Sequence, residues 1–184
     1  MPVVTEREQL PVAQARAGNA EAWESLFRRY RLPLYVYVFE LVRDEQTSLD
    51  LVQETFINAF RHIATLREDS KFGSWLFGIA HQKCIQQWRK RDRDVGLREE
   101  LAATPEIGDN DPLELLIREE QEANVMKLLS ELPLPQRSAL LLHFVEEFSL
   151  EEIARITGAQ VGTVKSRLHY AKRTLRQLLE KQSP

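Results

Sequence analysis

Cysteine, glycine and long hydrophobic runs are scarce in this chain of 184 residues. Cys84 is the only cysteine, so no disulfide can form within the chain, and a reducing compartment is expected. No stretch approaches the roughly 20 apolar residues that span a bilayer, so membrane insertion is not expected. The N-terminal sequence MPVVTEREQLP lacks the basic and then apolar order of a secretory signal. These absences predict a cytoplasmic protein.

Patterns that carry enzymatic chemistry are also missing. No glycine-rich phosphate loop, no nucleophile with a matched base and no catalytic carboxylate pair is evident. His81 and Cys84 have the spacing H-x-x-C, but a tetrahedral zinc site needs three or four protein ligands, and no second cluster accompanies them. We therefore predict neither an enzyme nor a metal or cofactor site.

Positive charge is not in excess either, because the formal net charge is −3. Its distribution along the chain is more informative than its sum. Residues 1–94 carry 14 Lys and Arg against 13 Asp and Glu, residues 95–125 carry 2 against 9, and residues 126–184 carry 9 against 6. Two lobes that are neutral or basic therefore flank an acidic connector, and either lobe could contact DNA.

Apolar residues recur at spacings of three and four, the period of amphipathic helices, and no strand pattern is convincing. We predict helices over residues 7–17, 20–30, 33–43, 46–63 and 72–91, and then over 113–131, 135–146, 149–157 and 161–180. Asn19 and Asp44 are the expected N-caps of two of them. Residues 95–112 end in TPEIGDNDP and show no helical stripe, which predicts a linker. The expected fold is all-α, with two small helical domains, residues 1–94 and 113–184, joined by a flexible acidic linker.

A helix-turn-helix is predicted within the C-terminal domain. In Ser149-Leu-Glu-Glu152, a serine at the N-cap and a glutamate three residues later can satisfy each other's backbone amides. Gly158 can adopt the left-handed turn that ends this helix, and the apolar period resumes at Val161. Two helices joined by a short glycine turn are the arrangement that presents a recognition helix to DNA.

The second helix of this unit has a largely basic face opposite its apolar stripe. Lys165, Ser166 and His169 lie near its N-terminal end, where a recognition helix meets base edges. Lys172 and Arg173 follow at the positions expected to meet phosphates. A basic face can also be simply solvated, but the capped helix and the glycine turn before it favour DNA binding.

Two blocks of motifs resemble a known family. The segment Asp50-Leu-Val-Gln-Glu-Thr-Phe56, followed by Phe72-Gly-Ser-Trp-Leu-Phe-Gly-Ile-Ala80 and Trp88-Arg-Lys-Arg-Asp-Arg93, closely resembles the second conserved domain of extracytoplasmic function (ECF) sigma factors. Residues 149–173, with Val161-Gly-Thr-Val-Lys-Ser-Arg-Leu168, look like their fourth domain. The blocks occur in the family's order and cover most of residues 10–180. The resemblance implies a factor that binds core RNA polymerase and directs promoter recognition, −10 melting and transcription initiation.

The resemblance also implies three groups of site residues. Polymerase binding, on the β′ clamp, is assigned to Asp50, Gln53 and Glu54, which share one helical face, whereas Leu51, Val52, Phe56 and Phe60 are expected to face the domain core. Binding of −10 DNA is assigned to Leu66, Lys71, Gln82, Arg89, Lys90, Arg91 and Arg93. Binding of −35 DNA is assigned to Lys165, Ser166, Arg167, His169, Tyr170, Lys172 and Arg173. The chain departs from the family at Gln82, where asparagine is common, and at Leu66, where an aromatic residue is frequent.

Phe72 and Trp75 could stack on unpaired bases, because aromatic side chains serve as platforms for single strands. Trp75, however, recurs with Leu76, Ile79 and Lys83 at helical spacing. We therefore assign Trp75 to the core.

Two other functions remain open from the residues alone. A conventional helix-turn-helix regulator, whose first domain senses a ligand or dimerises, would bind an operator on its own. A protein that only docks on polymerase or another protein would tolerate changes in the recognition helix. The family resemblance further implies contacts with the polymerase β subunit and promoter DNA, and an anti-sigma factor as a possible partner.

Overall fold

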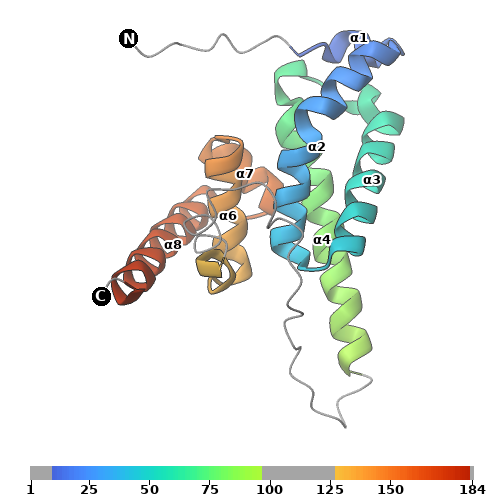
Figure 1. Cartoon of the computed structure of the whole chain (residues 1–184). Coiled ribbons are helices and arrows are strands. Elements are labelled where there is room, and N and C mark those ends of the chain that lie inside the picture. Colours follow the sequence, from blue (N-terminus) through green and yellow to red (C-terminus); the bar gives the residue numbers. More distant parts are fainter. Residues whose placement is uncertain (1–9, 97–126, 183–184) are drawn as a thin grey trace, which may run out of the picture.

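A computed structural model describes residues 10–96 and 127–182, and the side chains of these residues apart from 92–96 and 181–182 (Figure 1). Helices and short helical turns make up the elements of this part of the chain, and no strand occurs in it. None of the described helices combines the length and the apolar composition needed to cross a bilayer. The all-α prediction is confirmed for these residues.

The N-terminal lobe consists of α1 (Val12–Arg16), α2 (Ala20–Val42), α3 (Glu45–His62) and α4 (Phe72–Gly96). Two 3-10 turns, η1 (Ile63–Thr65) and η2 (Asp69–Lys71), lie in the connection between α3 and α4. The first helix is shorter than the predicted range 7–17, and α4 runs beyond the predicted end at residue 91 into the range expected to be linker.

The predicted break between helices 20–30 and 33–43 is wrong, because α2 continues through Pro33. An interior proline removes one backbone hydrogen bond and costs about 3 kcal/mol. Leu26, Tyr30, Leu34 and Leu41 nevertheless form one buried face along the entire helix. Burial of this continuous face stabilises the helix across the proline. This stabilisation comes from tertiary packing, which the position of a proline in the sequence does not reveal.

Side-chain caps begin α2 and α3 where the sequence predicts them. Asn19 accepts a hydrogen bond from the backbone N–H of Ala22 at 2.9 Å, and Asp44 accepts one from that of Thr47 at 2.8 Å. Each satisfies a donor that has no partner within the helix. Arg43, between α2 and α3, takes a left-handed conformation with φ of 56° and lets the chain reverse.

The C-terminal lobe contains α6 (Leu134–Val145), α7 (Leu150–Thr157) and α8 (Val161–Gln182). Ser149 and Glu152 form both hydrogen bonds of a capping box, and Gly158 ends α7 with φ of 66°. The helix-turn-helix prediction is therefore confirmed. The predicted helix over residues 113–131 lies largely outside the described residues, of which 127–130 are helical.

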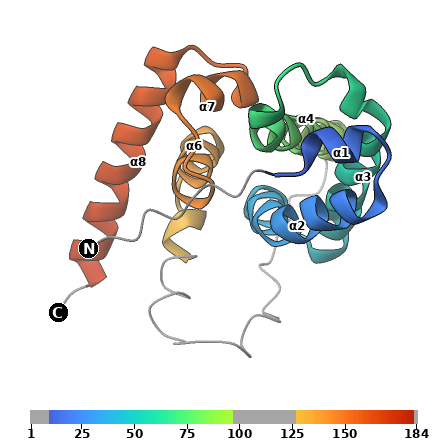
Figure 2. The same cartoon turned by 90° about the horizontal axis from the view of Figure 1, so that it is seen from above.

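The two lobes pack against each other. Figures 1 and 2 show α6 and α7 between α8 and the N-terminal lobe, with α7 against α4 and α6 beside α2. The rings of Phe77 in α4 and Phe148 before α7 meet edge to face, with centroids 5.3 Å apart. Buried side chains of both lobes consequently form one continuous apolar cluster.

Candidate polymerase and nucleic-acid interfaces

The exposed face of α3 carries the three residues predicted to bind polymerase. Asp50, Gln53 and Glu54 are all exposed, while Leu51 and Val52 between them are buried. Their positions follow from helical geometry, in which residues three and four apart share a face. Gln46 donates to Asp50 at 3.1 Å, and Lys83 of α4 forms an ion pair with Glu54 at 2.9 Å. The carboxylates are thus held at the surface by weak, exposed contacts.

An apolar groove continues this face towards the end of α3. Trp23, Phe27, Phe56, Ile57 and Phe60 line most of an open hollow of about 670 Å³. The expectation that Phe60 faces the core is wrong, because Phe60 is 60% exposed and leans on Trp23, with centroids 5.1 Å apart. Helical period alone did not indicate this groove. The signal available in the sequence was the pair Ile57 and Phe60, which extends the apolar stripe of α3 sideways.

The connection between α3 and α4 is tied to α1. Arg16 donates to the backbone oxygen of Leu66 at 3.0 Å and pairs with the Asp69 carboxylate at 2.6 Å. The Leu66 side chain is only 8% exposed and belongs to the core, so it does not face a DNA strand here. Leu66 directly follows the short helical turn η1, and it belongs to the same buried cluster as Ile63.

Lys71 and Gln82, two of the residues predicted to bind −10 DNA, lie in different surroundings. Lys71 lies where the two lobes meet, and Gln82 lies on the exposed surface of α4. Lys71 ends η2, is partly exposed, and forms an ion pair with Glu152 of α7 at 3.1 Å. Gln82 is exposed on α4. Lys71, at the start of α4, is therefore already paired with the C-terminal lobe.

The basic run of α4 is exposed at Arg89, Lys90 and Arg91. Arg91 donates to the backbone oxygen of Val42 at 3.3 Å, and the indole N–H of Trp88 donates to that of Leu41 at 2.9 Å. These contacts fasten α4 to the end of α2. The side chain of Arg93 lies outside the described residues.

Phe72 and Trp75 differ in burial. Phe72 is fully buried against Trp23 and Tyr30, which leaves it no surface for a base. Trp75 is partly buried and packs against the same core, as predicted from its helical spacing. The neighbouring Gly73 permits close packing of α4 on α2, because a Cβ atom there would lie 2.8 Å from the Tyr30 hydroxyl.

The recognition helix α8 presents a polar and basic face. Six of the seven residues predicted to bind −35 DNA are exposed: Lys165, Ser166, His169, Tyr170, Lys172 and Arg173. Arg167 is half-buried, and its charge acts on His81 of the N-terminal lobe. Val164, Leu168 and Ala171 are buried beneath this face and hold α8 on α6 and α7.

His81 and Cys84 belong to the core rather than to a metal centre. The Tyr37 hydroxyl lies 2.8 Å from Nδ1 of His81, and burial, followed by nearby Arg167, lowers the pKa of His81 to about 4. Burial raises the pKa of the Cys84 thiol to about 12. Within the described residues, no group of three or more His, Cys, Asp and Glu side chains has the arrangement of a metal site.

The geometry agrees with comparisons to known proteins. Residues 26–94 match the family model of sigma-70 region 2, and residues 122–175 match that of sigma-70 region 4. The chain is 30% identical to RNA polymerase sigma-H factor of Pseudomonas aeruginosa, over 95% of each protein. It is 31% identical to RNA polymerase sigma factor YlaC of Bacillus subtilis, over 89% of this chain and 95% of that protein.

A solved structure gives the same result. The sigma factor RpoE of Bartonella quintana, in complex with the anti-sigma factor NepR, superimposes with a TM-score of 0.71 at 26% identity, covering 86% of this chain and 99% of that one. A further sequence relative, the ECF RNA polymerase sigma factor SigW of Bacillus subtilis, is 28% identical over 91% of this chain and 94% of that protein. The chain therefore belongs to the ECF family of RNA polymerase sigma factors, non-enzymatic initiation factors that bind core polymerase and direct it to promoters.

Proposed function

We propose that the two lobes divide the work of promoter recognition between them. Residues 1–94 dock on the polymerase β′ clamp and bind the melted −10 strand, residues 113–184 read −35 DNA and contact the β subunit, and residues 95–112 connect them. Because its partner is RNA polymerase, the chain acts in the cytoplasm.

The exposed polar face of α3 is the observation that carries this proposal. Asp50, Gln53 and Glu54 stand together on a helix whose opposite side is buried, and the apolar groove at Phe60 adjoins them. Charged residues beside exposed aromatic side chains are typical of a protein-binding surface. Two aromatic residues of this groove, Phe27 and Phe60, are exposed by 43% and 60%.

For −10 DNA, we assign phosphate contacts to Lys71, Arg89, Lys90, Arg91 and Arg93, and base contact to Gln82 and the exposed part of the loop before α4. Leu66 would have to leave the core to reach a base, so we assign it to holding this loop in place. For −35 DNA, Lys165, Ser166 and His169 read bases from the major groove. Arg167, Tyr170, Lys172 and Arg173 make the surrounding phosphate contacts.

Reconstituted transcription tests this function. Core polymerase stripped of other initiation factors is incubated with promoter-containing genomic fragments of the host, with and without this chain, and permanganate footprinting reports strand opening. Core and chain together should open DNA and make transcript, and neither should do so alone. Tight operator binding by the chain alone, without opening when core is added, would support a conventional regulator instead.

An anti-sigma factor, which the RpoE relative binds, would co-purify with the chain from cells.

A further inference from the structure

The connection between α3 and α4, residues 63–71, is the segment to which the proposed function assigns base contact in the −10 strand. Two backbone hydrogen bonds close its turns. At the end of η1, the Leu66 amide donates to the Ile63 carbonyl at 3.1 Å, and in η2, the Lys71 amide donates to the Glu68 carbonyl at 3.0 Å. Neither bond joins one turn to the other, so these bonds do not fix how the two turns stand relative to each other.

Arg16 of α1 joins the two turns. One guanidinium nitrogen, Nη2, donates to the Leu66 carbonyl at 3.0 Å and to the Asp69 carboxylate at 2.6 Å. Leu66 directly follows η1, and Asp69 is the first residue of η2. Hydrogen bonds in which the donor or the acceptor is charged are roughly twice as strong as neutral ones. A single side chain therefore sets the spacing between the two turns.

Two residues, Arg67 and Glu68, lie between the points that Arg16 holds. Both are exposed, whereas Leu66 before them is buried in the core. The pair therefore forms a short exposed arch that is fixed at both of its ends. Arginine side chains bond to guanine and glutamate side chains to cytosine. The direction in which these two side chains meet a base depends on the backbone of the arch.

Arg16 acts from a fixed base, because α1 is anchored in the core. Val12 and Ala15 are buried. The indole N–H of Trp23 in α2 donates to the Ala15 carbonyl at 2.9 Å. A binding group is held most precisely when the residues behind it are themselves held by packing and hydrogen bonds. The helix α1 therefore supplies a fixed attachment point for the arch.

The ion pair between Arg16 and Asp69 is better suited to positioning than to stability. Its side chains are 33% and 41% exposed, and a pair so close to water adds little to the stability of the fold. Ile63 and Leu66, both buried, already anchor the connection in the core. Loss of the pair should therefore leave the fold intact and change the local geometry of the arch.

We propose that Arg16 is a positioning residue for −10 recognition: it holds the arch of Arg67 and Glu68 in the conformation that reads an unpaired base. This inference rests on the proposed function, in which the connection before α4 contacts the −10 strand. Arg16 contacts no base and acts through Leu66 and Asp69. The helix α1 then contributes to promoter specificity, although it lies outside residues 26–94, which match the region 2 family model.

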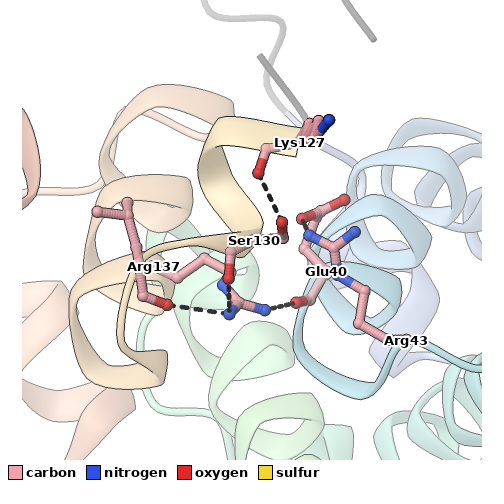
Figure 3. Close-up of polar contacts among 6 residues, drawn as sticks. Glu40, Arg43, Lys127, Ser130 and Arg137 are labelled. Atoms are coloured by element: carbon pink, nitrogen blue, oxygen red, sulfur yellow. Dashed lines mark hydrogen bonds and ion pairs between the residues drawn. The ribbon is translucent and has the colours of Figure 1, made fainter. Parts of the chain in front are cut away.

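Two single variants and their combination test this role in the holoenzyme of core polymerase and the full chain. Arg16→Gln removes both bonds to the connection, and Asp69→Asn removes the ion pair but leaves the arginine in place. Arg137→Gln is the matched control. Arg137 also holds main-chain carbonyls, three of them, at the end of α2 and before α6 (Figure 3). The control thus removes the same charge and similar bonds at another place in the fold.

Base preference is measured by selection from a forked DNA library whose unpaired −10 strand is randomised. Sequencing of bound and free DNA gives the relative affinity for each base at each position. Arg16→Gln should reduce the parent's preference about 5-fold or more at one or two positions, because recognition of one base typically contributes a preference of about 5- to 150-fold. Asp69→Asn should change the same positions. The double variant should be no worse than Arg16→Gln, because both changes remove one contact.

Two outcomes of the variants would overturn the proposal. Unchanged preference in Arg16→Gln, or the same change in Arg137→Gln, would show that the contact does not position the arch. A uniform loss of affinity in Arg16→Gln, with the salt slope reduced by about 1 and Asp69→Asn without effect, would show that Arg16 contacts a phosphate instead. Circular dichroism reports the thermal midpoint of each variant. If Arg16→Gln lowers the midpoint, Asp69→Asn decides the question.

The parent holoenzyme separates this inference from the proposed function. Fluorescence anisotropy reports docking of the chain on core polymerase independently of DNA. A parent that docks but shows no −10 preference would contradict the proposed function, and the role of Arg16 with it. A parent with a clear preference that survives both Arg16→Gln and Asp69→Asn would overturn only the role of Arg16.

Discussion

Exposed carboxylates on α3 contribute little to the fold, because their partners Gln46 and Lys83 form surface contacts that add about 0–1 kcal/mol each. Changing Asp50→Ala with Glu54→Ala should therefore weaken binding to core polymerase about tenfold or more, while the thermal midpoint changes little. Titration of labelled chain with core measures the affinity. Glu131→Ala with Glu180→Ala, which removes two exposed carboxylates from the other lobe, should leave the affinity unchanged; equal losses would assign the effect to net charge.

The face of α8 contains two kinds of residue with different expected salt responses. Arg173→Ala should weaken −35 binding on all sequences and reduce the slope of log affinity against log salt by about 1, as for one lost phosphate contact. Lys165→Ala should instead change the preference at particular base pairs. Filter binding of the holoenzyme to a set of −35 variants at several salt concentrations distinguishes them. Uniform effects of both substitutions would contradict the division into reading and anchoring residues.

His81 makes stability depend on pH. Its pKa is about 4 in the folded chain and about 6.5 when exposed, so the unfolded chain binds more protons between these values. The stabilisation is complete above pH 6.5 and is lost as the pH falls towards 4. Denaturant unfolding of the parent and of His81→Gln should show that their difference in unfolding free energy shrinks by about 2–3 kcal/mol between pH 7 and 4.5. A constant difference would mean that His81 does not titrate in this way.

Among the helices, α7 depends most visibly on its cap. It is only 8 residues long, and Ser149 and Glu152 supply both hydrogen bonds of its capping box. Short helices gain little from propensity alone, so the cap and packing must hold them. Ser149→Ala should lower the free energy of unfolding by about 1 kcal/mol, and Ser149→Thr, which retains the hydroxyl, by much less. Urea unfolding checks both, and equal effects would rule out the cap as the cause.

The helix α2 shows that a proline in the sequence does not always mark the end of a helix. Pro33 predicts a boundary, yet the buried face from Leu26 to Leu41 crosses it without interruption. The end of the same helix depends on donors from α4 and α6, since Trp88, Arg91 and Arg137 cap its last carbonyl groups. Its length is therefore set by its neighbours in the fold.

Over the whole molecule, we expect the two lobes, each binding DNA weakly as proposed, to gain affinity by being held on one polymerase. Linked modules can gain about 10²- to 10⁴-fold when their targets are correctly spaced. Adding five base pairs between the −10 and −35 elements turns one by about half a helical repeat, and should reduce open-complex formation at least about tenfold. Permanganate footprinting on promoters with altered spacers measures this. Indifference to spacing would show that the lobes do not act together.

Apart from the break predicted at Pro33, the sequence by itself determined the main helices of the described residues, their caps at Asn19, Asp44 and Ser149, and the helix-turn-helix. These features depend on residues within about four positions of each other. It also indicated the polar face of α3 through helical spacing. Its motifs, through their resemblance to a known family, indicated the two-lobed sigma architecture that the comparisons confirm.

Only the tertiary structure decided which of these residues are exposed and could contact a partner. The backbone oxygen of Leu66 is bound by Arg16, 50 positions away, and Arg137 donates to the carbonyl of Glu40 across 97 positions. Phe60 is exposed although its spacing resembles that of a core residue. Contacts between distant residues depend on how helices pack in three dimensions, and no local pattern of spacing or charge specifies that packing.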